Sequence, residues 1–236
     1  MLREEIGRAG YTEVLTHGLC SVHDNFTALQ CPIREDLAVS LSNPANVEYQ
    51  VIRTTLLPGL LKTFQHNKSA SFANGFKLFE ISDAVIIDRE NVVTNTVVGA
   101  RNIRKLAAAY AGPTSGFEII HGLVDRIMTL IEVAPEASYV ATSGKKSSIT
   151  GGADEEQYRV SREGWFYTIA PLPHDGNAHE SKMYFPGRAA EVLLTKPASK
   201  KKVRIGTFGI LHPVVLKNFD IMYPCSVVEI DLEELM

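Results

Sequence analysis

Two glycines, Gly206 and Gly209, are the residues of this 236-residue chain that come closest to a phosphate-binding loop. Such a loop needs glycines at a junction between a strand and a helix, where free backbone N–H groups can donate to a ligand. The stretch "GTFGILHP" has G-x-x-G spacing, and it matches neither G-x-G-x-x-G nor G-x-x-x-x-G-K-[ST]. Strand-like residues follow Gly209. The pattern therefore favours a strand in which glycine allows close approach of a neighbouring backbone.

Histidines and lysines offer two further kinds of site. His174 and His179 are the closest histidine pair, and no cysteine or paired carboxylate lies at zinc-ligand spacing from them. A zinc site is therefore not expected. Lys200, Lys201 and Lys202 form a basic run between two predicted strands. We interpret this run as a solvated hairpin turn, and a contact with RNA phosphates is the alternative.

Acidic and nucleophilic residues give no catalytic pattern. Asp231, Glu233 and Glu234 lie near the C-terminus and could act in acid–base chemistry. At the end of a terminal strand they are expected instead to form its polar face. The sequence has no G-x-S-x-G motif and no Cys–His pair placed as nucleophile and base. The residues by themselves therefore indicate no independent catalytic activity.

Length and composition narrow the class of protein. The chain is 45% hydrophobic and 22% charged, with a net charge of −3, which suits one large or two small globular domains. The slight acidity argues against a strongly basic nucleic-acid-binding protein, and no apolar run reaches the ~20 residues that span a bilayer. Three widely spaced cysteines, Cys20, Cys31 and Cys225, indicate free thiols in a reducing compartment. We expect a cytoplasmic protein without membrane contact.

Hydrophobic periodicity predicts the elements that must position these residues. Helical spacing occurs over residues 2–9, 53–67 and 116–133, with a short helix at 213–219. Strand patterns occur over residues 11–19, 36–44, 75–87, 105–112, 188–196, 202–211 and 225–235, with one more aromatic strand after residue 164. A β-bulge is expected near Ser82 and Asp83. Many strands with few, separated helices indicate an α+β domain with a mainly antiparallel sheet.

Six segments occur in an order that resembles one known family. They are "GYTEVLTHGLCS", "SNPANVEYQVIRTTLLPGLLKTFQHN", "FKLFEISDAVI", "FEIIHGLVDRIMTL", "FPGRAAEV" and "GILHPVVL". Together they resemble the C-terminal module of phenylalanyl-tRNA synthetase β subunits of the archaeal and eukaryotic cytosolic type. The resemblance implies a single class II aminoacyl-tRNA synthetase-like domain over 1–236, with an antiparallel sheet flanked by helices. An insertion is expected at 143–182, of which 143–157 is a Gly/Ser/charge-rich loop.

The resemblance also implies that this copy of the fold is inactive. The α subunit of the family carries R-T-H-T-S-P where this chain has Arg53-Thr54-Thr55-Leu56-Leu57-Pro58, so the degenerate positions include Thr55 and Leu57. An ATP-binding arginine of the α subunit corresponds to Glu80, whose carboxylate would repel a triphosphate. The final segment, "VEIDLEEL", lacks the family's glycines and arginine. No catalytic, cofactor-binding or metal-binding residue is therefore expected in this chain, and ATP and magnesium would be used by the whole complex.

The implied role is assembly with the α subunit. The complex is a heterotetramer, a phenylalanine–tRNA ligase that attaches phenylalanine to tRNA(Phe). The first helix and strand, residues 2–19, are expected to form the subunit contact, and the isolated chain is expected to self-associate. The candidate interface residues are Leu2, Ile6, Ala9 and Tyr11. An editing domain precedes this module in the family, so the chain is expected to be a fragment.

Two other functions remain open at this stage. A self-sufficient ATP-dependent ligase would need an arginine clamp for ATP, which the sequence does not place. A free-standing RNA- or protein-binding module would rest on the basic run at 200–202. The resemblance places no substrate contact at Arg188 in "FPGRAAEV", so we expect this residue to be structural and to pair with a nearby carboxylate or carbonyl.

Overall fold

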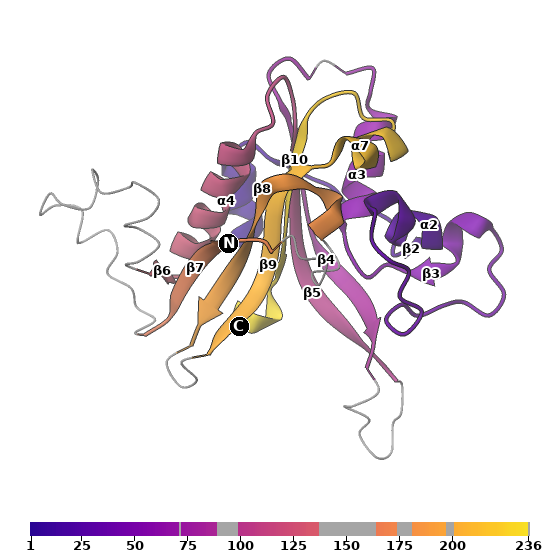
Figure 1. The fold of residues 1–236 in the computed structure, drawn as a ribbon, viewed down its shortest axis with the longest axis horizontal. Helices are drawn as coiled ribbons and strands as arrows, with labels where there is room; N and C mark the ends of the chain where they lie inside the picture. Colours follow the sequence, from indigo (N-terminus) through magenta and orange to yellow (C-terminus); the bar gives the residue numbers. More distant parts are fainter. Residues whose placement is uncertain (71, 89–98, 137–163, 174–180, 197–200, 236) are drawn as a thin grey trace, which may run out of the picture.

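An eight-stranded sheet forms the centre of the molecule (Figure 1). The computed structural model describes residues 1–70, 72–88, 99–136, 164–173, 181–196 and 201–235. The strand order is β1-β4-β5-β10-β9-β8-β7-β6, and neighbouring strands are antiparallel except for the β1–β4 and β6–β7 pairs. The predicted α+β class with a mainly antiparallel sheet is confirmed.

The sheet strands are long in the middle and short at both edges. They are β1 (Thr12–Glu13), β4 (Phe76–Ile87), β5 (Ala100–Ala111), β6 (Ala134–Pro135), β7 (Phe166–Pro171), β8 (Tyr184–Thr195), β9 (Lys202–Leu211) and β10 (Cys225–Asp231). A separate two-stranded sheet pairs β2 (Leu19–Cys20) with β3 (Val51–Ile52). Strand β7 lies within the range expected to be an insertion and pairs with β8 in the main sheet. Residues 143–157 lie outside the described residues.

Helices cover both faces of the sheet. The α-helices are α1 (Leu2–Arg8), α2 (Val22–Asn25), α3 (Leu57–His66), α4 (Phe117–Leu130) and α7 (Pro213–Asn218). Short 3-10 turns are η1 (Thr27–Leu29), η2 (Val47–Tyr49), η4 (Ser181–Met183) and η5 (Glu233–Leu235). Helices α1 and α4 pack on one face, and α3 and α7 pack on the other (Figure 1). None of the described helices is long and apolar enough to cross a membrane.

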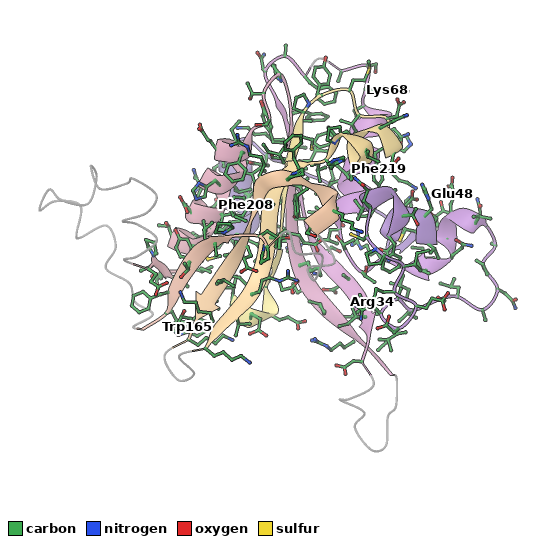
Figure 2. The ribbon with its side chains drawn as sticks, viewed as in Figure 1. Arg34, Glu48, Lys68, Trp165, Phe208 and Phe219 are labelled. Carbon is green, nitrogen blue, oxygen red and sulfur yellow. The ribbon has the colours of Figure 1, made fainter. Side chains whose placement is uncertain are left out.

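The burial of β5 on both faces of the sheet explains why apolar residues follow one another without interruption in this strand. Leu106, Ala108 and Tyr110 belong to the core under α4, whereas the alternate residues Ala107 and Ala109 belong to the core under α3. Successive side chains of a strand point to opposite faces, so a strand buried on both faces needs apolar residues at every position. Figure 2 labels one aromatic residue from each core, Phe208 under α4 and Phe219 beside α3 and α7.

Three strand predictions were inaccurate. Residues 11–19 are strand only at their two ends, in β1 and β2. Residues 36–44 contain no strand and contribute one bridge, from Ser40 to Val51, because this segment packs in a small separate core with α2. The predicted bulge at Ser82 and Asp83 is wrong, since β4 and β5 pair without interruption. The irregularities lie instead in β8, between Tyr184 and Ala189 and between Val192 and Leu193.

Candidate functional site

Glu80, one of the three degenerate nucleotide-site positions, lies in a closed ionic network. It is fully buried in β4. Its Oε1 accepts a hydrogen bond from Arg53 Nη1 at 2.9 Å, and its Oε2 accepts from Thr16 Oγ1 at 2.6 Å. The side chains of Arg53 and Glu80 are only 7% and 1% exposed. The sequence predicts that the Glu80 carboxylate would face a triphosphate, whereas the structure gives it a buried counter-ion.

Arg53 uses its remaining donors inside the same network. Its Nη2 donates to Ser82 Oγ at 2.7 Å, its Nε donates to the Asp83 carbonyl at 3.1 Å, and its Nη1 also reaches Thr16 Oγ1 at 2.8 Å. A buried charge is tolerated when it is paired and when its other polar atoms are hydrogen-bonded. Arg53 and Glu80 satisfy this condition, so the pair is built to hold β4 against the segments before β2 and after β3.

Thr55, the second degenerate position, belongs to another ionic network. Its Oγ1 donates to Glu229 Oε1 at 2.7 Å, and the Leu56 backbone N–H donates to the same oxygen at 2.7 Å. Lys105 Nζ lies 3.2 Å from Glu229 Oε2 and 2.6 Å from Asp231 Oδ1. This network therefore joins the entry of α3 to the middle of the sheet.

Lys105 is charged in this network despite its burial. Burial alone would lower the pKa of Lys105, but the carboxylates of Glu229 and Asp231 outweigh it and hold the pKa above its ordinary value. One lysine between two carboxylates leaves a formal charge of −1, before the hydrogen bonds from Thr55 and Leu56 are considered. The strong coupling makes Lys105 a fixed cation at neutral pH.

The second network lines a cavity of about 520 Å³. Thr55, Lys105 and Glu229 contribute polar surface, and Leu57 contributes apolar surface. Leu57, the third degenerate position, is 3% exposed and packs within the buried face of α3. Glu80 does not line this cavity. The structure therefore brings Thr55 and Leu57 together at one cavity and places Glu80 in a separate network.

A second cavity of about 400 Å³ lies beside the first network. Arg53, Thr16 and Thr55 line it, together with Leu15 and Tyr49 from the surface. Within the described residues, no group of three or more His, Cys, Asp or Glu side chains is placed to bind a metal ion.

The four candidate interface residues lie mainly inside this chain's own core. Ile6 and Tyr11 are 1% and 6% exposed and pack with α4, and the half-buried Leu2 and Ala9 pack against the same cluster. Burial raises the pKa of the Tyr11 hydroxyl, with a smaller contribution from Tyr110. The apolar face of α1 is thus already occupied, and the contact of these residues with a partner subunit stays a prediction.

The outward face of α1 is charged. Arg126 Nη2 of α4 donates to Glu5 at 2.9 Å, and Arg8 Nη1 donates to the same side chain at 2.7 Å. These hydrogen bonds, Arg126 first, lower the pKa of Glu5. Because the side chains are exposed, such ion pairs contribute little to stability.

Sequence reasoning missed a group of exposed apolar residues near the second cavity. Leu15 is 82% exposed, Val47 is 69% exposed and Tyr49 is 37% exposed. His17 meets Tyr49 edge-on, with ring centroids 6.2 Å apart. We call Leu15, His17 and Tyr49, which line this cavity together, the β1–η2 patch. The alternation of side chains along residues 11–19 could have shown that Leu15 faces away from Val14 and Thr16. Nothing in the neighbouring sequence indicates that Tyr49 lies beside it.

The glycines of β9 are explained by close backbone contact, as predicted. A Cβ on Gly206 would lie 2.3 Å from the Glu229 carbonyl oxygen, and one on Gly209 would lie 2.7 Å from the Arg188 carbonyl oxygen. His212 begins α7, and its Nδ1 accepts a hydrogen bond from the Val214 backbone N–H at 3.2 Å. The stretch is therefore a strand that ends at a helix cap.

Two other predictions concern basic residues. Lys202 begins β9, and its Nζ lies 2.7 Å from Glu136 Oε2, so this member of the basic run is engaged in an ion pair. The predicted pairing of Arg188 is wrong within the described part of the chain, because its exposed side chain has no hydrogen bond or ion pair there. It protrudes from the irregular part of β8, where residues 185–188 oppose only Ile210. Lys200, His174 and His179 lie outside the described residues.

Comparison with known proteins relates the whole chain to one family. Residues 1–232 match the family described as the phenylalanyl tRNA synthetase beta chain CLM domain. The human phenylalanine–tRNA ligase beta subunit is 40% identical over 232 residues, which are 98% of this chain and 32% of that protein. The cytoplasmic phenylalanine–tRNA ligase beta subunit of Arabidopsis thaliana is 38% identical over 238 residues, covering 100% of this chain and 33% of that protein. This chain spans about one third of the length of these curated relatives.

Comparison with solved structures supports the fold. The Desulfitobacterium hafniense protein PylSc, a pyrrolysyl tRNA synthetase, aligns with a TM-score of 0.57 and 11% sequence identity. The alignment covers 99% of this chain and 66% of that chain. The predicted class II synthetase-like fold is confirmed by this likeness, which at such low identity concerns the fold alone.

Proposed function

Because the chain belongs to the phenylalanyl tRNA synthetase beta chain CLM-domain family, we propose that it is a non-catalytic, synthetase-like module of phenylalanine–tRNA ligase. Its role is to bind the α subunit and so to assemble a cytoplasmic heterotetramer. The complex uses ATP and magnesium to attach phenylalanine to tRNA(Phe), and this chain meets tRNA only through the complex. The names of the relatives support this proposal, since each is a phenylalanine–tRNA ligase beta subunit.

The observation that carries the non-catalytic role is the state of Glu80. An ATP-binding site of this fold would require a cation directed at the triphosphate, and this position holds a buried carboxylate. The neighbouring cation, Arg53, is committed to Glu80, Thr16 and Ser82. Freeing it for a ligand would leave Glu80 buried without its counter-ion, which is strongly unfavourable.

Phenylalanine-dependent exchange of pyrophosphate into ATP tests the catalytic part of this proposal. The 236-residue chain alone should give no exchange above a protein-free blank, whereas the α subunit supplied with its whole β subunit should exchange. Exchange that scales with the concentration of this chain would contradict the proposal. It would favour the self-sufficient ligase.

The β1–η2 patch is the surface that we propose for the α subunit. Large apolar side chains are exposed together there, and apolar surface of this kind marks contact sites on soluble proteins. The patch begins directly after β1, so it continues the helix-and-strand region that the sequence predicted as the interface. Leu15 and Tyr49 also line the 400 Å³ cavity, which could receive a partner side chain.

A matched pair of variants tests this surface. Leu15→Asp should weaken binding of the α subunit by at least about tenfold if Leu15 is a buried anchor. Met222→Asp makes the same kind of change at an equally exposed apolar residue, 88% exposed and outside the patch, and it should leave the dissociation constant unchanged. Sedimentation of the chain alone should also show less self-association for Leu15→Asp than for Met222→Asp. Equal binding by both variants would remove the patch from the interface.

A further inference from the structure

We propose that the 520 Å³ cavity is a binding site for a small organic carboxylate with an apolar body. The cavity lies over the face of the sheet that carries Lys105, Thr207 and Glu229, on β5, β9 and β10. Subunit assembly does not require such a ligand, and the proposal does not depend on the β1–η2 patch. Three observations carry it: the apolar wall of the cavity, an unpartnered buried amide and the donor that remains on Lys105.

The wall of the cavity is apolar and already buried. Its innermost apolar side chains are between 2% and 8% exposed. They are Phe26, Leu29, Leu57, Ile103 and Met183. A volume of this size lies within the range of sites that enclose small molecules, and such sites combine apolar walls with a few polar groups. The cavity therefore suits a compact ligand with an apolar body.

Asn25 supplies an unpartnered hydrogen-bond donor. The residue lines the cavity and is 2% exposed. Its Oδ1 accepts from the Thr54 backbone N–H at 3.1 Å, which fixes the orientation of the amide. Its Nδ2 has no hydrogen-bond partner among the described residues. Because a buried N–H without an acceptor is costly, an acceptor brought by a ligand would relieve that cost.

The polar groups that line the cavity favour a ligand that accepts hydrogen bonds. Arg34, Lys105 and Arg204 are cationic, and Glu229 is the carboxylate among the described lining residues. Both oxygens of Glu229 are already engaged, and Arg34, which Figure 2 labels, is held by the exposed Asp36. Lys105 is likewise offset by Glu229 and Asp231. A ligand with an ammonium group would find no open acceptor on Glu229, whereas a carboxylate would meet donors on Lys105 and Asn25.

Lys105 can bind such an anion without losing its partners. An ammonium group has three N–H donors, and Lys105 uses two of them for Glu229 and Asp231. Lys105 and Asn25 both line the cavity, and a carboxylate has several acceptor positions, so the ligand head group can accept from either residue. Inorganic phosphate would satisfy the donors but would leave the apolar wall uncovered, which is why the ligand class is an apolar carboxylate.

Calorimetric titration of the 236-residue chain with three matched probes tests the site. The probes are 3-phenylpropionate, 3-phenylpropanamide and 3-phenylpropylamine, which differ only in the polar end. We expect 3-phenylpropionate to bind with a dissociation constant of about 1 mM or below, as suits a ligand of this size. The amide should bind at least tenfold more weakly, and the amine should show no saturable binding. Inorganic phosphate is the control for charge alone.

Two substitutions, each with a matched control, locate the bound probe. Asn25→Asp preserves shape and replaces the donor with a carboxylate, so it should weaken 3-phenylpropionate binding at least tenfold. Asn102→Asp makes the same change at an exposed position on β5 outside the cavity and should have no effect. Arg204→Glu at the exposed rim should also weaken binding, with Lys217→Glu on α7 as its control. If circular dichroism shows that Asn25→Asp does not fold, the Arg204→Glu pair decides.

A direct readout separates this site from any other. In nitrogen-15 NMR spectra, the Asn25 side-chain resonances should shift as 3-phenylpropionate is added. The proposal is overturned if no probe saturates up to about 10 mM, if the amine binds as well as the carboxylate, or if Arg204→Glu and Lys217→Glu bind alike. Because the titration uses the chain without the α subunit, its failure is distinguishable from failure of the assembly role.

Discussion

The two ionic networks of the sheet share their chemistry and differ in their openness. Arg53 and Glu80 are 7% and 1% exposed at the side chain, and although Arg53 borders the 400 Å³ cavity, its guanidinium is bonded to Glu80, Thr16 and Ser82. Lys105 and Glu229 are 14% and 13% exposed, Asp231 is 37% exposed, and Lys105 and Glu229 border a cavity. Each network borders a cavity, but Arg53 binds several partners inside the protein, whereas Lys105 uses two of its three donors and keeps one available. Whether a buried charge is structural or able to bind a ligand thus depends on what surrounds it, more than on the residue type.

Removing Arg53 should give the largest loss of stability in the molecule's polar interior. Arg53→Met leaves Glu80 buried without a counter-ion, and we expect a loss of about 3–5 kcal/mol in the free energy of unfolding. Urea unfolding followed by circular dichroism measures this loss. The double variant Arg53→Met/Glu80→Met removes both charges and should recover most of it. A loss below about 1 kcal/mol in the single variant would mean that Glu80 finds water.

Removing Lys105 should cost less, because its network is more open. Lys105→Met leaves Glu229 and Asp231 as neighbouring carboxylates, and we expect a loss of about 2–3 kcal/mol at pH 7, reduced from the buried-pair value by partial exposure. The same unfolding experiment measures this loss. Equal losses for Lys105→Met and Arg53→Met would erase the contrast between the two networks.

The backbone beneath the second network should also be sensitive to a single methyl group. Gly206→Ala places a Cβ 2.3 Å from the Glu229 carbonyl oxygen, which is held in the β9–β10 ladder. We expect a loss of about 1–3 kcal/mol from this overpacking. Gly122→Ala in α4 meets nothing within 4 Å and should instead stabilise the chain by about 0.5–1 kcal/mol. Thermal unfolding of both variants shows directly whether each one is less stable or more stable than wild type.

The smallest expected loss of stability occurs at alkaline pH and involves Cys20, which lies near Arg53 of the first network. Burial, with a smaller contribution from Asp24, raises the pKa of the Cys20 thiol to about 11. The folded state holds this proton more tightly than the unfolded state. The stability that the protonated Cys20 thiol contributes to the folded state is therefore complete at neutral pH and is lost as the pH rises toward 11. By pH 10 the loss should reach about 1 kcal/mol. Comparison of unfolding at pH 7.5 and pH 10 measures it.

Cys20→Ala should remove this part of the alkaline loss. Burial also raises the pKa of Cys225, so both the variant and wild type keep a further alkaline dependence from that thiol. The difference between the two proteins isolates Cys20. Parallel pH curves would show that the Cys20 thiol ionises equally in the folded and unfolded states.

The sequence by itself determined the elements with strong local periodicity. The apolar stripe of α4, the continuous apolar run of β5 and the strand between Lys202 and Leu211 all follow from the spacing of neighbouring residues. Each pattern reports which face of one element must be buried, and that information is local. The family resemblance was equally local, since it rests on short segments in a fixed order.

Only the tertiary structure decided which side chains meet. Glu80 pairs with Arg53, which is 27 positions away, and Thr55 donates to Glu229, which is 174 positions away. The sequence therefore predicted a carboxylate facing a triphosphate at Glu80 and a subunit contact at Ile6, and the structure buries both side chains within this chain. Periodicity states that a face is buried but not what covers it. Charge pairing and cavity shape depend on distances between segments far apart in the chain, which folding alone sets.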